Sequence, residues 1–254
     1  MLAPTREEAL AYEVDGYFVR KGFLNNAEVA DFRDSARRQL EEESREGSVM
    51  QKGDKAGNTT LLKMWTRAGD DKYGLLARDE RLVRMSEALI GTDVYLYSHK
   101  MTMKQPREGG AWEWHQDYGY WYNNACLAPE MLSIWIALDP SNKANGCLQV
   151  LKGSHALGRL NHVREDGQTN VEAAYLEAAL GRYEHLYVEM DAGDALVFHC
   201  NLLHRSDANK SDTYRWGYIC SYNAVRNAPF QSLRDYGDYE EMRTVTAGSF
   251  LAAE

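Results

Sequence analysis

Four residues of this 254-residue chain have types and spacing that suit metal chemistry: His115, Asp117, His204 and Arg215. His115 and Asp117 are two positions apart, so both side chains lie on one side of an extended segment. Two imidazoles and one carboxylate are the facial triad typical of non-haem Fe(II), which leaves three coordination positions open. Arg215 follows His204 by eleven residues and would offer a planar fork to the far carboxylate of a dicarboxylate co-substrate.

Each of these features is weak on its own. A single His-x-Asp often arises by chance, and a strand-edge histidine beside a turn aspartate explains it equally well. A non-redox metal-binding β-barrel of the cupin kind would need the three ligands but no arginine, so Arg215 favours an enzyme over that alternative. Zn-dependent hydrolysis has less support, because no carboxylate base stands beside the ligands as in His-Glu-x-x-His.

Composition narrows the class of partner. The 29 Lys and Arg residues against 38 Asp and Glu give a formal net charge of −9, without a basic cluster. Phosphate backbones and anionic lipid surfaces attract basic proteins, so no nucleic-acid or membrane-surface binding is expected. No run approaches the roughly 18 apolar residues of a membrane span, and residues 1–13 do not resemble a secretory signal. We therefore expect a cytoplasmic protein with a small-molecule substrate.

The elements that must hold these residues change in type along the chain. Residues 5–46 are predicted to be mainly helical, and Asn25 with Glu28 forms a capping-box pattern. A second helix is predicted from Asp79 to Ile90, ended by Gly91. Residues 170–181 are predicted as a helical insertion. Strands are predicted at residues 94–104, 133–138, 147–151, 195–199 and 216–222.

Short strands separated by turns indicate a β-sandwich or barrel rather than a parallel α/β sheet. Because no linker or repeat interrupts the chain, we predict a single domain over residues 1–254, mainly β with helical additions. Its core is expected at about 60–227, with the N-terminal helices packed on it. Residues just after Asp117 should lie near the mouth of the site, where Tyr118 and Trp121 could form a substrate wall.

Several stretches of the sequence resemble the phytanoyl-CoA dioxygenase (PhyH) family of Fe(II)/2-oxoglutarate oxygenases. The resemblance covers about residues 16–227 and is densest from Trp114 to Arg215. It implies a double-stranded β-helix core, the jelly-roll of cupin-like proteins. The matching stretches are Trp114-His115-Gln116-Asp117, Asn145-Gly146-Cys147-Leu148, Gly153-Ser154-His155, Gly193-Asp194 and His204 through Arg215.

The resemblance also implies roles for individual residues. The catalytic iron ligands would be His115, Asp117 and His204. Arg215 would hold the distal carboxylate of 2-oxoglutarate, with Ser206 beside it. The residues that match further positions lining the co-substrate in the family are Trp135, Met101 and Lys63.

The implied cofactors are Fe(II), 2-oxoglutarate and O2, with ascorbate as a candidate reductant. The implied reaction hydroxylates an unactivated C–H of a small or medium metabolite and releases succinate and carbon dioxide. Asp117 favours hydroxylation over halogenation, because related halogenases replace this carboxylate by a small residue. Desaturation, ring formation and a member that has lost catalysis stay open. Acyl-CoA would need cationic contacts that this acidic chain does not suggest, and we expect a monomer or a homodimer.

Overall fold

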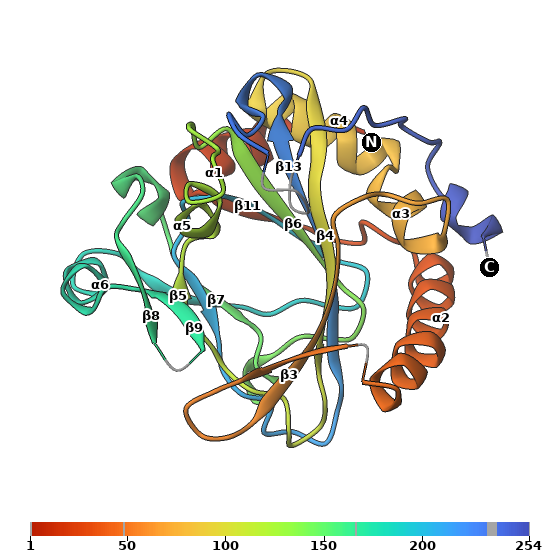
Figure 1. Ribbon diagram of the computed structural model, residues 1–254, viewed down its shortest axis with the longest axis horizontal. Coiled ribbons are helices and arrows are strands. Elements are labelled where there is room, and N and C mark those ends of the chain that lie inside the picture. Colours follow the sequence, from red (N-terminus) through yellow and green to blue (C-terminus); the bar gives the residue numbers. More distant parts are fainter. Residues whose placement is uncertain (1, 48, 166, 233–237, 254) are drawn as a thin grey trace.

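Two antiparallel sheets face each other in this computed structural model, which describes residues 2–47, 49–165, 167–232 and 238–253 (Figure 1). The larger sheet has the strand order β1-β11-β6-β13-β4-β3-β2. Its strands are β1 (Tyr17–Arg20), β11 (Ala195–His199), β6 (Met131–Ala137), β13 (Arg215–Ala224), β4 (Val94–Lys104), β3 (Thr59–Trp65) and β2 (Met50–Gly53).

The smaller sheet has the order β10-β7-β12-β5. Many of the paired strands in both sheets are far apart in sequence, as a double-stranded β-helix requires. The prediction of a mainly β jelly-roll is therefore confirmed. The strands of the smaller sheet are β10 (His185–Val188), β7 (Leu148–Leu151), β12 (His204–Ser206) and β5 (Trp112–His115), and a separate hairpin consists of β8 (His162–Glu165) and β9 (Gln168–Val171).

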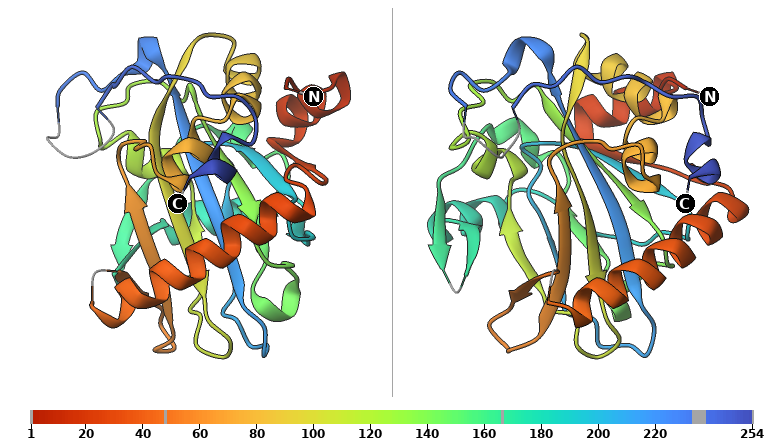
Figure 2. Two further views of the ribbon diagram at one scale, coloured as in Figure 1. Left: turned by 90° about the vertical axis from the view of Figure 1, so that its right-hand side faces the viewer. Right: turned by 45° about the vertical axis from the view of Figure 1, so that its right-hand side comes forward.

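Helices cover the outer face of the larger sheet, and α2 crosses that face in Figure 2. The capping box predicted for α2 is present, because Asn25 Oδ1 accepts from the Glu28 N–H at 3.1 Å and Glu28 Oε2 accepts from the Asn25 N–H at 2.8 Å. None of the described helices has the length and apolar character that a membrane span needs. The helices on this side are α1 (Arg6–Asp15), α2 (Asn26–Arg45), α3 (Lys72–Ala77) and α4 (Glu80–Ile90).

Side chains along β13 alternate between a buried apolar cluster and a cavity. Trp216 and Tyr218 point outward into a buried apolar cluster between the sheet and the helices. Arg215 and Ile219 point inward and line a cavity between the two sheets. The same period of two applies to the neighbouring strands, so each strand of the larger sheet offers one face to the core and one to the cavity.

The predicted helical insertion at residues 170–181 is partly wrong. The first residues of this segment belong to β9, and the helix α6 covers only Ala173–Leu180. Gln168 explains the extended conformation, because it ties β9 to neighbouring segments. Its Nε2 donates to Gly53 O at 3.0 Å, and its Oε1 accepts from the Glu113 N–H at 3.0 Å. The hairpin also forms part of the wall of a cavity between the sheets, through Arg164, Gly167, Gln168 and Thr169.

Candidate active site

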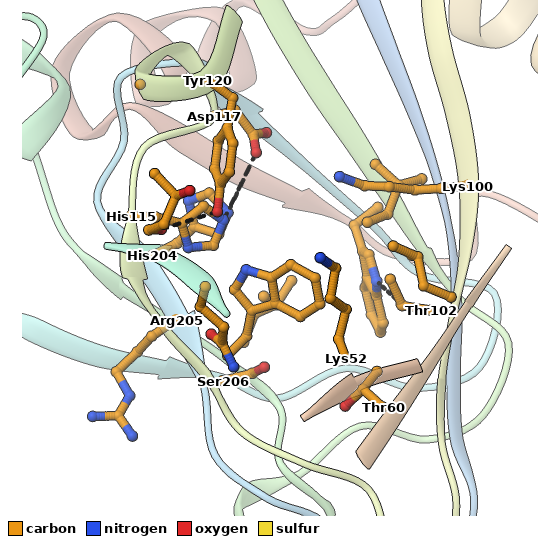
Figure 3. Close-up of a pocket in the computed structure, with 18 of the residues that line it drawn as sticks. Lys52, Thr60, Lys100, Thr102, His115, Asp117, Tyr120, His204, Arg205 and Ser206 are labelled. Atoms are coloured by element: carbon orange, nitrogen blue, oxygen red, sulfur yellow. Dashed lines mark hydrogen bonds and ion pairs between the residues drawn. The ribbon is translucent and has the colours of Figure 1, made fainter. Parts of the chain in front are cut away.

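A cavity of about 550 Å³ lies between the two sheets, and residues of α5 (Asp117–Trp121) and of the β8–β9 hairpin complete its wall. Figure 3 shows candidate metal ligands at one end and cationic side chains facing the same space. Asp117 is the only carboxylate among the described residues that line it. The cations in the lining are Lys52, Lys100, Lys104, Arg164, Arg205 and Arg215.

The three predicted metal ligands come together at one end of the cavity (Figure 3). His115 on β5 and His204 on β12 are direct cross-strand partners, and their ring centroids lie 4.1 Å apart. Asp117 is the first residue of α5, and its Oδ1 lies 3.9 Å from the Nε2 atom of each histidine. Pairing of β5 with β12 thus unites residues almost ninety positions apart in the chain.

Backbone carbonyls orient both imidazoles. His115 Nδ1 donates to Glu113 O at 2.8 Å, and His204 Nδ1 donates to Leu202 O at 3.0 Å. A carbonyl can only accept, so each Nδ1 carries the proton and each Nε2 presents its lone pair. Burial lowers the pKa of His204 and holds the pKa of His115 well below its usual range, so both rings are neutral at pH 7. Neutral imidazoles are the form that binds metals.

The carboxylate of Asp117 is also held in place. Its Oδ2 accepts from Ser133 Oγ at 2.7 Å, and Ser133 Oγ lies 3.0 Å from Ser221 Oγ. This bond leaves Oδ1 facing the two histidines. Two nitrogens and one carboxylate oxygen, each fixed by a further hydrogen bond, form a donor set that fits non-haem iron.

The residue between the two ligands anchors their segment. Gln116 Nε2 donates to Gly158 O and to Asn201 O, both at 2.7 Å, and its Oε1 accepts from the Leu160 N–H at 2.8 Å. The Gln116 N–H donates to His162 Nε2 at 3.0 Å. Sequence reasoning assigned neither residue a part in the site, and no spacing signal pointed to His162.

At the inner end of the cavity, Arg215 is buried and its guanidinium lies over the Trp135 ring, 4.6 Å from the centroid. Gly217 allows Trp135 this position, because a Cβ at Gly217 would fall 2.1 Å from the indole. Arg215 Nε and Nη2 have no hydrogen-bond partner among the described residues. Burial lowers the pKa of Arg215 to about 10, so it remains charged at neutral pH. A buried, unpaired fork of this kind fits a ligand carboxylate.

Of the four further residues predicted to line the co-substrate, two face the cavity and two face the other side of the sheet. Trp135 and Ser206 line the cavity. Met101 lies in the outer apolar cluster, and Lys63 forms an ion pair with Glu43 of α2, with Nζ and Oε2 2.7 Å apart. The prediction that Met101 and Lys63 line the co-substrate site is therefore wrong. The adjacent positions on β4 and β3 face the cavity instead: Lys100, Thr102, Leu62 and Met64.

The predicted substrate wall is also corrected. Trp121 lines the cavity, but Tyr118 packs in a separate apolar cluster, with its OH donating to Cys126 O at 3.1 Å. Tyr120 takes the expected place in the wall. The reason is that residues after Asp117 form a helix, so positions three and four residues later share its face.

Comparison with known proteins agrees with this geometry. The family model described as Phytanoyl-CoA dioxygenase (PhyH) matches residues 12–217. The chain is 28% identical over 248 residues to L-proline trans-4-hydroxylase of Streptomyces griseoviridis, covering 91% of each protein. It is 23% identical over 241 residues to the ectoine dioxygenase of Bordetella parapertussis, covering 89% of this chain and 77% of that protein.

The fold is shared with a solved structure. The crystal structure of EctD from S. alaskensis with 2-oxoglutarate and 5-hydroxyectoine superimposes with a TM-score of 0.80 at 22% identity, covering 97% of this chain and 89% of that one. The family match spans most of the chain, and the buried His-Asp-His cluster provides the donor set for iron. The chain therefore belongs to the phytanoyl-CoA dioxygenase family, as an iron- and 2-oxoglutarate-dependent dioxygenase.

Proposed function

We propose that this enzyme hydroxylates an unactivated C–H of a small metabolite that carries a carboxylate. Iron and 2-oxoglutarate supply the oxidising power, with succinate and carbon dioxide as co-products. We assign the iron to His115, Asp117 and His204, and the distal carboxylate of 2-oxoglutarate to Arg215. Ser206 and Trp135 complete the co-substrate wall in this proposal.

The observation that carries the substrate class is a pair of lysines, Lys52 on β2 and Lys100 on β4. Both are partly buried, line the cavity and direct their amines into it (Figure 3). Neither forms an ion pair with a carboxylate in the part of the chain that the structure describes, where Asp117 is the only carboxylate of the cavity lining. The charge of Lys100 contributes to the lowered pKa of His115 and His204, so it lies within electrostatic range of the metal ligands.

Half-buried cations without an ion-pair partner favour an anionic ligand. Arg215 already offers a site for the co-substrate, so the two lysines are free to attract a second carboxylate. Lys100 is the better candidate for direct contact with the substrate, because its charge reaches the metal end. The relative named L-proline trans-4-hydroxylase acts on a free amino acid, which supports a compact substrate of this class.

Aromatic side chains of α5 would position the carbon skeleton. Tyr120 and Trp121 line the cavity next to Asp117, and the Tyr120 OH donates to Thr169 O at 2.9 Å. That bond joins α5 to the hairpin strand β9. The two rings therefore offer a fixed, largely apolar wall beside the metal ligands, suited to the aliphatic part of a small molecule.

The test is substrate-stimulated release of succinate with iron, ascorbate and 2-oxoglutarate. Each candidate is supplied as the free acid and as its amide, beginning with L-proline and L-prolinamide and continuing through amino acids and cyclic imino acids. We expect stimulation by one or more free acids and little by the matched amides. Lys100→Met should raise the KM for the active acid about 10- to 100-fold, the effect of losing one charged contact. Exposed Lys210 provides the control, and Lys210→Met should leave this KM unchanged.

Equal stimulation by acids and amides would contradict the carboxylate proposal. If the wild-type protein binds metal but shows no visible band of chelated 2-oxoglutarate, the non-redox metal-binding alternative is favoured instead. These two failures are separate, because the first concerns the substrate and the second the use of the co-substrate.

A further inference from the structure

The β8–β9 hairpin lies against β5, the strand that carries His115 (Figure 1). β5 is the edge strand of the smaller sheet, and its pairing with β12 contains a register shift between His204 and Ser206. An edge strand leaves the backbone groups on its outer side without a ladder partner. The outer side of β5 must therefore be held by groups outside the sheet.

Gln168 of β9 takes the place of a neighbouring strand. Its Oε1 accepts from the Glu113 N–H at 3.0 Å, and its Nε2 donates to Ala111 O at 3.1 Å and to Gly53 O at 3.0 Å. The side chain is 6% exposed, so little water competes for these bonds. The carbonyl of Glu113 is the group that accepts from His115 Nδ1 at 2.8 Å. Gln168 thus fixes the residue whose carbonyl orients a candidate metal ligand.

His162 of β8 holds the next part of the same segment. Its Nδ1 donates to Leu160 O at 2.9 Å, so its Nε2 is an acceptor, and this atom accepts from the Gln116 N–H at 3.0 Å. Gln116 stands between the two candidate ligands of this segment. The ring also packs against the backbone of α5, because a Cβ at Gly119 would fall 2.3 Å from His162 Cε1.

The two bonds act on the backbone on both sides of His115. The N–H of Gln116 belongs to the rigid peptide plane that joins it to His115. His115 Nε2 and Asp117 Oδ1 lie 3.9 Å apart, so rotation of that plane would change how the two donor atoms face each other. Neither hairpin residue belongs to the His-Asp-His cluster of the described chain. Both can therefore affect a metal only through the ligands that they hold in place.

We propose that Gln168 and His162 are positioning residues for the metal ligands, so that the β8–β9 hairpin sets the geometry of the iron site from outside the ligand set. The inference rests on the assignment of iron to the His-Asp-His cluster proposed above. The hairpin also lines the cavity through Arg164 and Thr169. A molecule bound against that wall thus touches the element that aligns the metal ligands.

The test replaces the acceptor of His162 in two ways. His162→Phe removes Nε2 and keeps most of the ring volume, whereas His162→Gln keeps a side-chain oxygen that can accept from the Gln116 N–H. Co(II) is the probe, because its visible absorption reports the geometry of its ligands and its affinity can be measured by calorimetry without turnover. We expect His162→Phe to bind Co(II) about 10-fold more weakly and with altered visible bands, at the low end of the range for groups that hold metal ligands. His162→Gln should recover most of both properties.

A matched control is a buried histidine outside the cavity. Both ring nitrogens of His99 are hydrogen-bonded, one to the Tyr218 OH and the other to Arg67 O. His99→Phe should lower the free energy of unfolding but leave the affinity and visible bands of Co(II) at their wild-type values. His115→Ala is the reference for the ligand assignment, because it should lose most of the Co(II) affinity whether or not the hairpin contributes.

The outcomes separate the role of the hairpin from the ligand assignment. Wild-type Co(II) affinity and bands in His162→Phe would overturn the role of His162, and so would equal losses in His162→Phe and His162→Gln. Failure of His115→Ala to weaken Co(II) binding would instead overturn the ligand assignment. If His162→Phe does not fold, Gln168→Met removes the bond to Glu113 from the other strand of the hairpin and should weaken Co(II) binding in the same way. Unchanged Co(II) binding in Gln168→Met would then overturn the inference.

Discussion

The two ends of the cavity differ in how their charges are balanced. At the metal end, two neutral imidazoles face one carboxylate, and each of the three side chains has a further hydrogen bond. The imidazoles donate to Glu113 O and Leu202 O, and the carboxylate accepts from Ser133 Oγ. At the inner end, Lys104 and Arg215 are buried opposite each other without a carboxylate partner in the described chain. The fold completes the hydrogen bonds of the metal end, whereas we expect a ligand anion to complete those of the inner end.

This difference separates two kinds of preorganisation. Ligand orientation at the metal end is built into strand pairing and carbonyl positions, so it exists before iron binds. The charge of Arg215 is buried without a hydrogen-bond partner for Nε and Nη2 in the described chain, so 2-oxoglutarate bound there should stabilise the protein by binding only the native form. Substitutions at the metal end should therefore lower iron affinity more than 2-oxoglutarate affinity. Those at the inner end should lower 2-oxoglutarate affinity more than iron affinity.

The largest effect is expected from Asp117→Ala. It removes one of three ligands and the only carboxylate among the described lining residues. Even outer partners of metal ligands are worth about 10- to 100-fold in affinity, so loss of the ligand itself should lower iron affinity by more than about 100-fold. The visible band of the Fe(II)–2-oxoglutarate complex should disappear under anaerobic conditions. Asp212→Ala, at an exposed position, is the control, and survival of the band in Asp117→Ala would remove Asp117 from the site.

A second large effect is expected at the opposite end, from Arg215→Lys. The substitution keeps a charge but loses the planar fork, which should raise the 2-oxoglutarate requirement about 10- to 150-fold. Iron affinity should stay near the wild-type value, because the three metal ligands are untouched. Both quantities can be measured by calorimetry, with exposed Arg226→Lys as the matched control. Equal losses of affinity for iron and for 2-oxoglutarate would show that the two ends of the cavity do not act separately.

An intermediate effect is expected from the partner of Asp117. Ser133→Ala removes the hydrogen bond to Asp117 Oδ2, and iron affinity should fall about 10-fold, at the low end of the range for such partners. Binding of 2-oxoglutarate to the iron-loaded variant should change little. Ser221→Ala removes only the next hydroxyl in the chain of bonds and should cost less iron affinity. If the two serine variants behave alike, the bond to the carboxylate is not what orients it.

The sequence allowed the metal end to be predicted better than the walls. His115, Asp117 and His204 carry chemically rare side chains at recognisable spacing, and any fold that pairs β5 with β12 unites them. Whether a residue lines the cavity depends instead on which face of its strand points inward. A shift of one position moves the side chain from the cavity to the apolar core. Lys63 and Met101 were misplaced by that single position. Tyr118 was misplaced because a short helix, and not a strand, follows Asp117.

Charge balance could not be predicted from the sequence either. Lys104 and Arg215 are 111 positions apart, and only the register of β4 against β13 makes them neighbours. The bond from Gln116 to His162 depends in the same way on the β8–β9 hairpin, which the sequence analysis does not predict. Long-range pairings of this kind leave no local pattern in the chain.

The smallest effect is expected from Lys63→Met, which tests the separation of the two faces of the sheet. Lys63 Nζ lies 2.7 Å from Glu43 Oε2, and both side chains are about one-quarter exposed, at 24% and 22%. Such a pair is worth about 0–1 kcal/mol, so the variant should lose at most that much free energy of unfolding. Iron affinity and the KM for 2-oxoglutarate should both remain at their wild-type values, because the ammonium lies on the helix side of β3. Chemical denaturation and succinate assays measure the two quantities separately. A several-fold rise in the KM for 2-oxoglutarate would show that the charge of Lys63 reaches the cavity, and that the alternation of β3 does not isolate the core face from the active site.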